Sequence, residues 1–311
     1  MFDFLINAEV VVDDVAVAER VFVDRLGFPE PRPWWKGTIS SGGFSYLFAR
    51  VHPSLEVSPT RVEAMALAPI DPGTAPFVPQ LFAAQGQRPW KTHGNEVASS
   101  DIGTVTARLE RNGCAFFTMP SEETYPFTRL WLGWTADGPG EYQPDGDGGL
   151  MLEICETDSL LQGPTLWDPR PDPELPAGSM IRVLRRSWIV ADLDATLRAL
   201  DHNLDWHPRA EPVLDADGGC RRVAMAFAHP RSAELELLEP IAPGEVLESL
   251  DTWGPGAWKI RIGVNDLRAK ADDLRHRGTT FSEHDPAGDD AVLLVDTADL
   301  GVPGLFEFTG I

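Results

Sequence analysis

One short pattern occurs four times along the 311 residues of this chain: an apolar strand that runs into an Asp, an apolar residue and an amphipathic helix. Internal repeats constrain a fold strongly, because each copy is expected to form the same supersecondary unit. An Asp side chain can accept hydrogen bonds from the free amides of a first helical turn, and its charge complements the helix dipole. The repeats therefore predict helix N-caps at Asp14, Asp101, Asp192 and Asp266.

Each predicted helix carries apolar residues at a spacing of three or four, so one face of it is expected to be buried. Two or three strands follow each helix, and the last of them reads RVEAMALAP, GLMLEICE, AELELLEP or GLFEF. The sequence thus predicts an α+β protein built of four βαβββ modules. The residues expected to end the helices in the left-handed conformation are Gly27, Gly113, Asn203 and Gly278.

Residues 162–178 contain five prolines and show neither a helical nor a strand period. Proline removes a backbone donor and restricts φ, so this segment is predicted to be an extended linker between two domains. The N-terminal domain is expected to span 1–161, and the C-terminal domain 179–311. Two cores are expected. The predicted modules cover about 1–85, 86–161, 179–250 and 251–311.

The chain is strongly acidic, with 48 Asp and Glu against 26 Lys and Arg and a net charge of −22. Such a surface repels phosphate backbones, so neither nucleic acid nor an anionic membrane is an expected partner. No apolar run approaches the roughly 18 residues of a membrane span, and the N-terminus lacks the basic start of a signal peptide. The cysteines are odd in number and have no Cys-x-x-Cys spacing, which favours reduced thiols and a cytoplasmic protein: Cys114, Cys155 and Cys220.

The repeats resemble the modules of the vicinal oxygen chelate superfamily, which includes glyoxalase I, extradiol dioxygenases, bleomycin-resistance proteins and some epimerases. The best carriers of the resemblance are VADLDATLRAL, VNDLRAKADDL, ELELLEP and GLFEF. The resemblance implies that modules pair into cupped half-barrels of mixed sheet, two in this chain, and that a divalent metal can sit in a cup. It also implies a small-molecule ligand, and it leaves a homodimer open.

Members of the superfamily take metal ligands from the first strand, seven residues before the cap Asp, and from the last strand, usually a Glu. A catalytic metal needs about three imidazole or carboxylate donors. This chain departs from the pattern, because several of its ligand positions hold other residue types. The first-strand positions here are Asn7, Gly94, Arg185 and Lys259. The last-strand positions are Met65, Glu153, Glu236 and Glu307.

In the N-terminal cup the open question is His93, which lies one residue before the family position. A one-residue offset turns a strand side chain to the opposite face, although a bulge at Gly94 would restore its direction. If His93 points inward, it could bind Fe, Mn, Ni or Zn together with Glu153 and one further donor. The further donor would be Asn7, Glu9 or Glu63. The alternative is a satisfied or exposed His93 without a metal.

In the C-terminal cup two cations occupy ligand positions, so no metal is expected there. Strand alternation directs Arg185, Lys259 and Arg261 to the side that also carries Glu236 and Glu307. These charges either neutralise one another in ion pairs or hold a carboxylate or enolate, with Glu236 or Glu307 as the base.

Four tryptophans are candidates for lining a ligand pocket, although large aromatic residues are more often part of a core. They are Trp34, Trp35, Trp131 and Trp134. Phosphate-loop, nucleophile-elbow and dinucleotide motifs are absent from the sequence.

Three functions follow from these observations. The first is an enzyme of the glyoxalase or dioxygenase type that acts on a small oxygenated molecule by isomerisation, lyase or ring-cleavage chemistry. The second is a metal-free protein that binds an aromatic or natural-product ligand, as bleomycin-resistance proteins do. The third is a structural role in which side chains fill both cups.

Overall fold

The computed structural model describes eleven segments of the chain. The described residues are 2–29, 35–40, 42–52, 57–70, 77–85, 91–119, 127–134, 142–157, 174–215, 219–284 and 291–311. The predicted linker therefore lies mostly outside the described residues, and the domain boundaries remain a prediction.

All four predicted βαβββ modules are present, with one connectivity. In each module the first strand pairs in parallel with the last, and the other two strands follow in antiparallel order. The N-terminal modules are β2 (Asn7–Val11), α1 (Val15–Arg20), β3 (Trp35–Ile39), β4 (Phe44–Ala49) and β5 (Arg61–Leu67), then β6 (Asn95–Ser99), α3 (Ile102–Arg111), β7 (Phe116–Met119), β8 (Arg129–Leu132) and β9 (Leu152–Glu156). The C-terminal modules are β10 (Met180–Ile189), α5 (Leu193–Leu204), β11 (Val213–Asp215), β12 (Cys220–Ala224) and β13 (Glu234–Pro240), then β14 (Gly256–Val264), α7 (Leu267–His276), β15 (Ser282–His284), β16 (Val292–Asp296) and β17 (Leu305–Gly310).

The predicted helix N-caps are confirmed, because each cap Asp accepts a hydrogen bond from an amide of the following turn. Three of the four predicted helix-ending residues, Gly27, Gly113 and Gly278, have the expected positive φ. The prediction at Asn203 is wrong: α5 continues to Leu204, and Asp205 takes the left-handed conformation at φ 55°. Asn203 is buried instead, and its side-chain amide donates to the carbonyls of Asp145 and Gly146.

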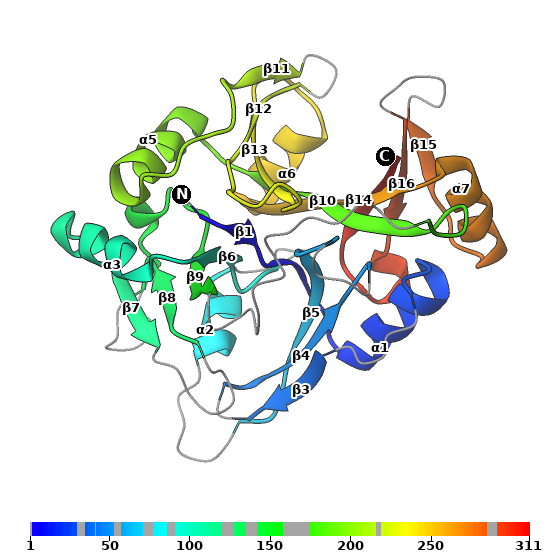
Figure 1. Cartoon of the computed structure of the whole chain (residues 1–311), viewed down its shortest axis with the longest axis horizontal. Coiled ribbons are helices and arrows are strands. Elements are labelled where there is room, and N and C mark those ends of the chain that lie inside the picture. The colour runs from blue at the N-terminus through cyan, green and yellow to red at the C-terminus, as the bar shows by residue number, and fades with distance from the viewer. Residues whose placement is uncertain are drawn as a thin grey trace.

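The strands form cupped mixed sheets, which confirms the α+β class and the paired modules (Figure 1). In the C-terminal half, β10 and β14 pair antiparallel and join two modules into one eight-stranded sheet. In the N-terminal half, β1 (Phe4–Leu5) pairs with β6, whereas β2, one residue later, pairs with β5. The first strand of the chain thus connects a five-stranded sheet to a four-stranded one.

Two further helices follow the closing strands of the first and third modules. α2 (Phe77–Ala84) places Val78, Leu81 and Phe82 against an apolar cluster on the concave side of the N-terminal sheets. α6 (Glu245–Trp253) places Val246 against the corresponding cluster of the C-terminal sheet. Each cup therefore has one apolar side that a helix covers.

The two halves share one core, where the sequence suggested two. The largest cluster of buried apolar residues in the described segments draws on all four modules. Phe2 packs edge-on against Trp206, with ring centroids 4.7 Å apart. Helix contacts add to this junction, because α3 lies beside α5, and α7 lies beside the residues that follow α1 (Figure 1). Within the described residues no helix is both long and apolar enough to cross a bilayer, and Cys114, Cys155 and Cys220 are free thiols.

Candidate metal centre in the N-terminal cup

Four carboxylates lie in one row across the N-terminal cup. Parallel pairing places Glu9 of β2 opposite Glu63 of β5, and Glu96 of β6 opposite Glu153 of β9. Side chains alternate along a strand, so residues in register share a face. All four side chains are nine-tenths or more buried by residue, which is a large cost in desolvation unless each charge is compensated.

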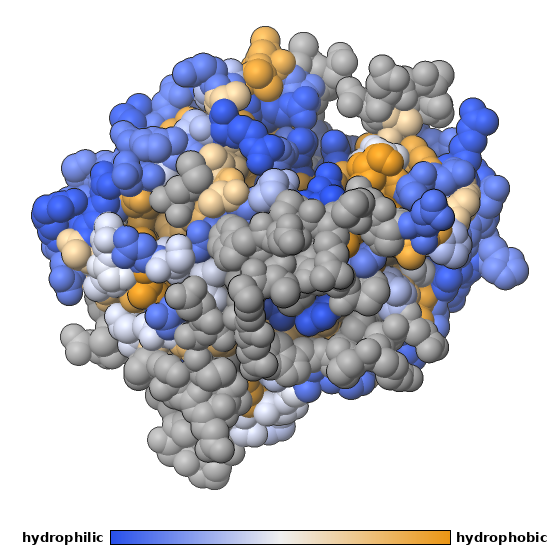
Figure 2. All heavy atoms as spheres, in the orientation of Figure 1, coloured by the Kyte–Doolittle hydropathy of each residue, from blue (hydrophilic) through white to orange (hydrophobic). Residues whose placement is uncertain are grey.

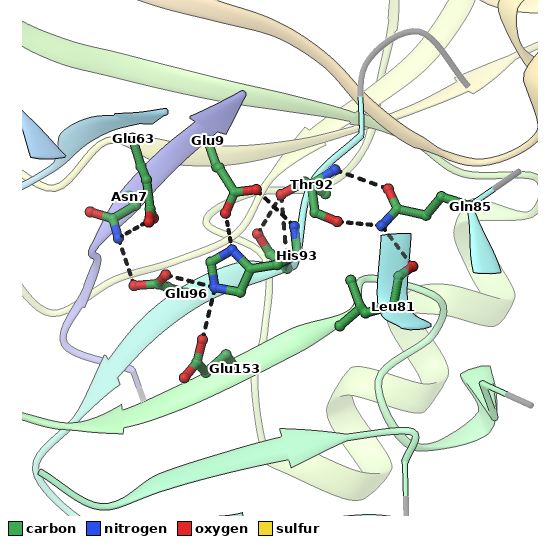
Figure 3. Close-up of polar contacts among 10 residues, drawn as sticks. Asn7, Glu9, Glu63, Leu81, Gln85, Thr92, His93, Glu96 and Glu153 are labelled. Carbon is green, nitrogen blue, oxygen red and sulfur yellow. Dashed lines mark hydrogen bonds and ion pairs between the residues drawn. The ribbon is translucent and has the colours of Figure 1, made fainter. Parts of the chain in front are cut away.

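His93 lies at the centre of this row (Figure 3). Its Nδ1 forms a short contact with Oε2 of Glu9, and its backbone N–H donates to Oε1 of the same carboxylate over 2.8 Å. On the other side of the ring, Nε2 lies 3.0 Å from Oε2 of Glu153 and 2.9 Å from Oε1 of Glu96. The His93 side chain therefore points into the cup, which is the direction that the sequence left open.

His93 reaches this place without a strand bulge. It precedes β6, which begins at Asn95, and the backbone between them passes close to the turn before β9. A Cβ on Gly94 would lie 2.5 Å from the carbonyl oxygen of Met151, so only glycine allows this approach. Because the Asn95 amide donates to the same carbonyl over 3.0 Å, the entry to β6 is held against the entry to β9.

Asn7 bridges two of the carboxylates. Its Nδ2 donates to Glu63 over 2.9 Å and to Glu96 over 2.6 Å. Its Oδ1 is buried and has no hydrogen-bond partner among the described residues. Buried polar atoms are normally paired, so this oxygen is a ligand atom that a bound cation could use.

Protons and one guanidinium compensate the charge in this structure. Burial lowers the pKa of His93, but its bonds to Glu153 and Glu96 outweigh burial and raise the pKa to about 9. Burial and the neighbouring Glu96 raise the pKa of Glu63 well above its usual value, and burial raises that of Glu153. Burial also acts to raise the pKa of Glu96, yet His93 holds it below its usual value. The buried Arg61 adds a positive charge beside Glu63 and Glu96.

The donor set fits a divalent cation. One ligand atom each from Glu9, Glu63, His93 and Glu96 lie within 4.8 Å of one another. Carboxylate oxygens with one imidazole suit Mn²⁺, Fe²⁺ and Zn²⁺. Glu153 is the second carboxylate on Nε2, and the bond from Glu9 to Nδ1 is the outer contact that commonly orients a metal-binding histidine.

Aromatic side chains form one wall of this site. The ring of Trp131 lies 5.5 Å from that of His93 and is stacked on Phe117 at 6.2 Å. Trp134 is buried deeper, against Tyr142 and near α2. Trp34 lies outside the described residues, as does the side chain of Trp35 in β3.

Glu96 is the site residue that sequence reasoning missed. It stands five residues before the cap Asp101, as Glu9 stands before Asp14, and that shared position was the available signal. Met65, at the superfamily's ligand position in the first module, is instead buried in the apolar cluster near α2. Glu63, two residues earlier on the same face, carries the carboxylate of that strand.

The C-terminal cup holds the predicted charged residues as ion pairs. Arg185 contacts Glu236 over 2.7 Å and Glu234 over 3.0 Å. Glu307 is 2.8 Å from Arg261 and 3.3 Å from Lys259. Burial acts to raise the pKa of Glu307, but these two cations outweigh it and hold the pKa below the usual value.

Comparison with known proteins rests on structure, since no family model matches the chain and no curated protein matches it by sequence. A variant of 4-hydroxymandelate synthase from Streptomyces coelicolor superposes with a TM-score of 0.66 at 15% identity, covering 100% of this chain and 93% of that chain. Methylmalonyl-CoA epimerase from Mycobacterium tuberculosis matches with a TM-score of 0.38 at 20% identity, over 44% of this chain and 92% of that chain. The repeated modules and the full-length superposition show that this chain shares the fold of 4-hydroxymandelate synthase.

Proposed function

We propose that this protein is a metal-dependent enzyme that acts on a small oxygenated organic molecule in its N-terminal cup. The observation that carries the proposal is the buried row of four carboxylates around His93. Burying that much negative charge is costly, and a divalent cation among these oxygens would offset the cost. The reaction class is isomerisation, lyase or ring-cleavage chemistry.

Within the cluster of ligand atoms, His93, Glu63 and Glu96 would hold the metal, and Glu9 would orient His93 through Nδ1. A cation bound there supplies Lewis acidity toward two neighbouring oxygens of a substrate. Asn7 would keep Glu63 and Glu96 in place, because its amide donates to both.

The chain's own groups would position the substrate and move its proton. Trp131 and Phe117 offer a flat apolar wall beside His93. Tyr46 of β4 is a further candidate for substrate contact, since it lies near Glu63. Burial raises the pKa of Tyr46, and the charge of Glu63 raises it further. Glu153, the carboxylate of the row outside the cluster of metal ligands, would accept the proton of the substrate.

The test is the metal content of protein purified without chelator, compared with two variants. Native protein is expected to retain near-stoichiometric Fe²⁺, Mn²⁺, Ni²⁺ or Zn²⁺, measured by elemental analysis. His93→Ala and Glu96→Gln are expected to lose most of it, because each removes a ligand. Glu236→Gln is the control, since Glu236 is a buried carboxylate on the last strand of the third module and lies in the other cup.

Equal metal content in all four proteins would contradict the proposal. No metal in the native protein, and no binding of added Mn²⁺ or Zn²⁺, would do the same. The second function, metal-free binding of an aromatic ligand, would then take its place. Quenching of tryptophan fluorescence by such ligands, reduced in Trp131→Phe, would support that reading.

A further inference from the structure

Two arginines face each other at the centre of the C-terminal cup. Arg185 of β10 and Arg261 of β14 are directly opposite in the antiparallel register that joins the third and fourth modules. Like charges in directly opposed positions destabilise a sheet. Each guanidinium is compensated from the strand on its outer side, Arg185 by Glu234 and Arg261 by Glu307, which are also in register. The row across the cup thus reads acid, base, base, acid.

The centre of this row differs in charge from that of the N-terminal cup. There the corresponding inner positions hold Asn7 and Glu96, which share a hydrogen bond of 2.6 Å. One fold thus presents an amide and a carboxylate to the middle of one cup and two guanidiniums to the middle of the other. A centre of opposed guanidiniums suits an anion, because the planar fork of arginine matches a carboxylate.

The C-terminal cup also carries an excess of positive charge. Among the described residues that its ion pairs join, five side chains are basic and four are acidic, an excess of one positive charge. The whole chain, in contrast, has a net charge of −22. A single bound monoanion would neutralise this excess.

The arginines are accessible as well as charged. The side chains of Arg185 and Arg261 are 21% and 27% exposed. Figure 2 shows the surface hollowed between the hairpin of β11 and β12 and the hairpin of β15 and β16, with hydrophilic atoms on the side of β12. Glu234, the partner of Arg185, is 22% exposed, and partly exposed ion pairs contribute about 0–1 kcal/mol, so an incoming carboxylate can displace Glu234 at low cost. Glu307, whose side chain is 10% exposed, is the more strongly held competitor at Arg261.

Apolar side chains adjoin Glu307, the partner of Arg261. Leu294 of β16 is the cross-strand neighbour of Glu307, and Leu305 precedes Glu307 by two residues on the same face. Lys259 lies over the ring of Trp258, 5.5 Å from its centroid. A ligand whose carboxylate replaced Glu307 at Arg261 would therefore bring its remaining atoms against leucine side chains.

We propose that the C-terminal cup is a binding site for a small organic carboxylate with an apolar group, held between Arg185 and Arg261. Binding exchanges an intramolecular carboxylate for that of the ligand, and it needs no metal. The site is separate from the N-terminal centre, and it stands or falls independently of the function proposed there.

Benzoate and its uncharged counterpart benzamide are suitable probes for titration calorimetry on the full chain at low salt. Benzoate is expected to bind with one-to-one stoichiometry, and benzamide at least about tenfold more weakly, because it lacks the charge that the guanidiniums pair with. Glu307→Gln is expected to tighten benzoate binding about two- to fivefold, since it removes the internal competitor.

The double variant Arg261→Gln, Glu307→Gln keeps the row neutral on that side, and it is expected to abolish benzoate binding while melting like the native protein. Arg221→Gln is the matched control, because this arginine pairs with Asp194 and Glu239 away from the row. Benzoate binding that is absent, equal to that of benzamide, weakened by Glu307→Gln or retained by the double variant would overturn the proposal.

Discussion

Asp147 shows how much a single residue contributes to the site without touching it. Its carboxylate is fully buried and accepts hydrogen bonds from the Tyr142 hydroxyl over 2.5 Å and from the amides of Gly149 and Leu152 over 3.1 and 2.8 Å. These bonds shape the turn that leads into β9, the strand that carries Glu153. Burial raises the pKa of Asp147 to about 6, against the opposing effect of the bonds it accepts.

A carboxyl group whose pKa is raised by folding stabilises the folded state at low pH. The contribution of Asp147 is therefore present in full below about pH 4 and is lost as the pH rises through about 6. Relative to Asp147→Asn, the native protein should lose about 2–3 kcal/mol of unfolding free energy between pH 4 and pH 7. Urea denaturation at several pH values measures this difference. The exposed Asp145→Asn in the same turn is the control, and parallel curves for native protein and Asp147→Asn would refute the prediction.

At the scale of elements, the candidate metal centre depends on the close approach of the backbone at the start of β6 to the backbone at the start of β9. Gly94 lets the chain before β6 pass the carbonyl of Met151, and Met151 itself has a left-handed φ of 52°. His93 is carried toward Glu153 by this contact between two strand entries. The strands alone would place the carboxylates in a row but would leave the imidazole undetermined.

Gly94→Ala is expected to lower the unfolding free energy by about 1–3 kcal/mol, because the added Cβ meets a backbone oxygen that cannot move freely. It is also expected to weaken Mn²⁺ binding by about tenfold or more through displacement of His93. Thermal melts and metal titration measure the two effects. Gly103→Ala in α3 is the control, since nothing lies within 4 Å of its added Cβ, and a native-like Gly94→Ala would contradict this account.

At the scale of the whole molecule, the halves are joined by side chains of one helix that donate to backbone carbonyls at the C-terminal end of another. Carbonyls at a helix C-terminus lack partners within the helix. Those that follow α1 receive donors from α7 and the residues after it, including Lys270 to Leu26 and Arg277 to Val23. On the opposite side of the molecule, Arg108 of α3 donates to the carbonyl of His202 in α5. Each N-terminal module is thereby fastened to a C-terminal one.

Lys270→Met tests the first of these junctions. Lys270 is 1% exposed by side chain and pairs with Asp273, so the substitution leaves that carboxylate one partner short and the Leu26 carbonyl without this donor. The unfolding free energy is expected to fall by about 1–3 kcal/mol, measured by urea denaturation. Arg275→Met, an exposed change on the same helix, should have little effect. Equal effects of the two variants would rule out a special role for Lys270.

The sequence alone determined the four modules, their helix N-caps and the face on which each strand carries its charges. These properties are local, because a cap Asp acts within one turn and side chains alternate along any strand. The tertiary structure decided that His93 points inward, that Glu96 joins the row, that Asn203 is buried and that the two halves share one core. Those outcomes depend on contacts between residues far apart in the chain, such as Gly94 with Met151 and Phe2 with Trp206, which no local period encodes.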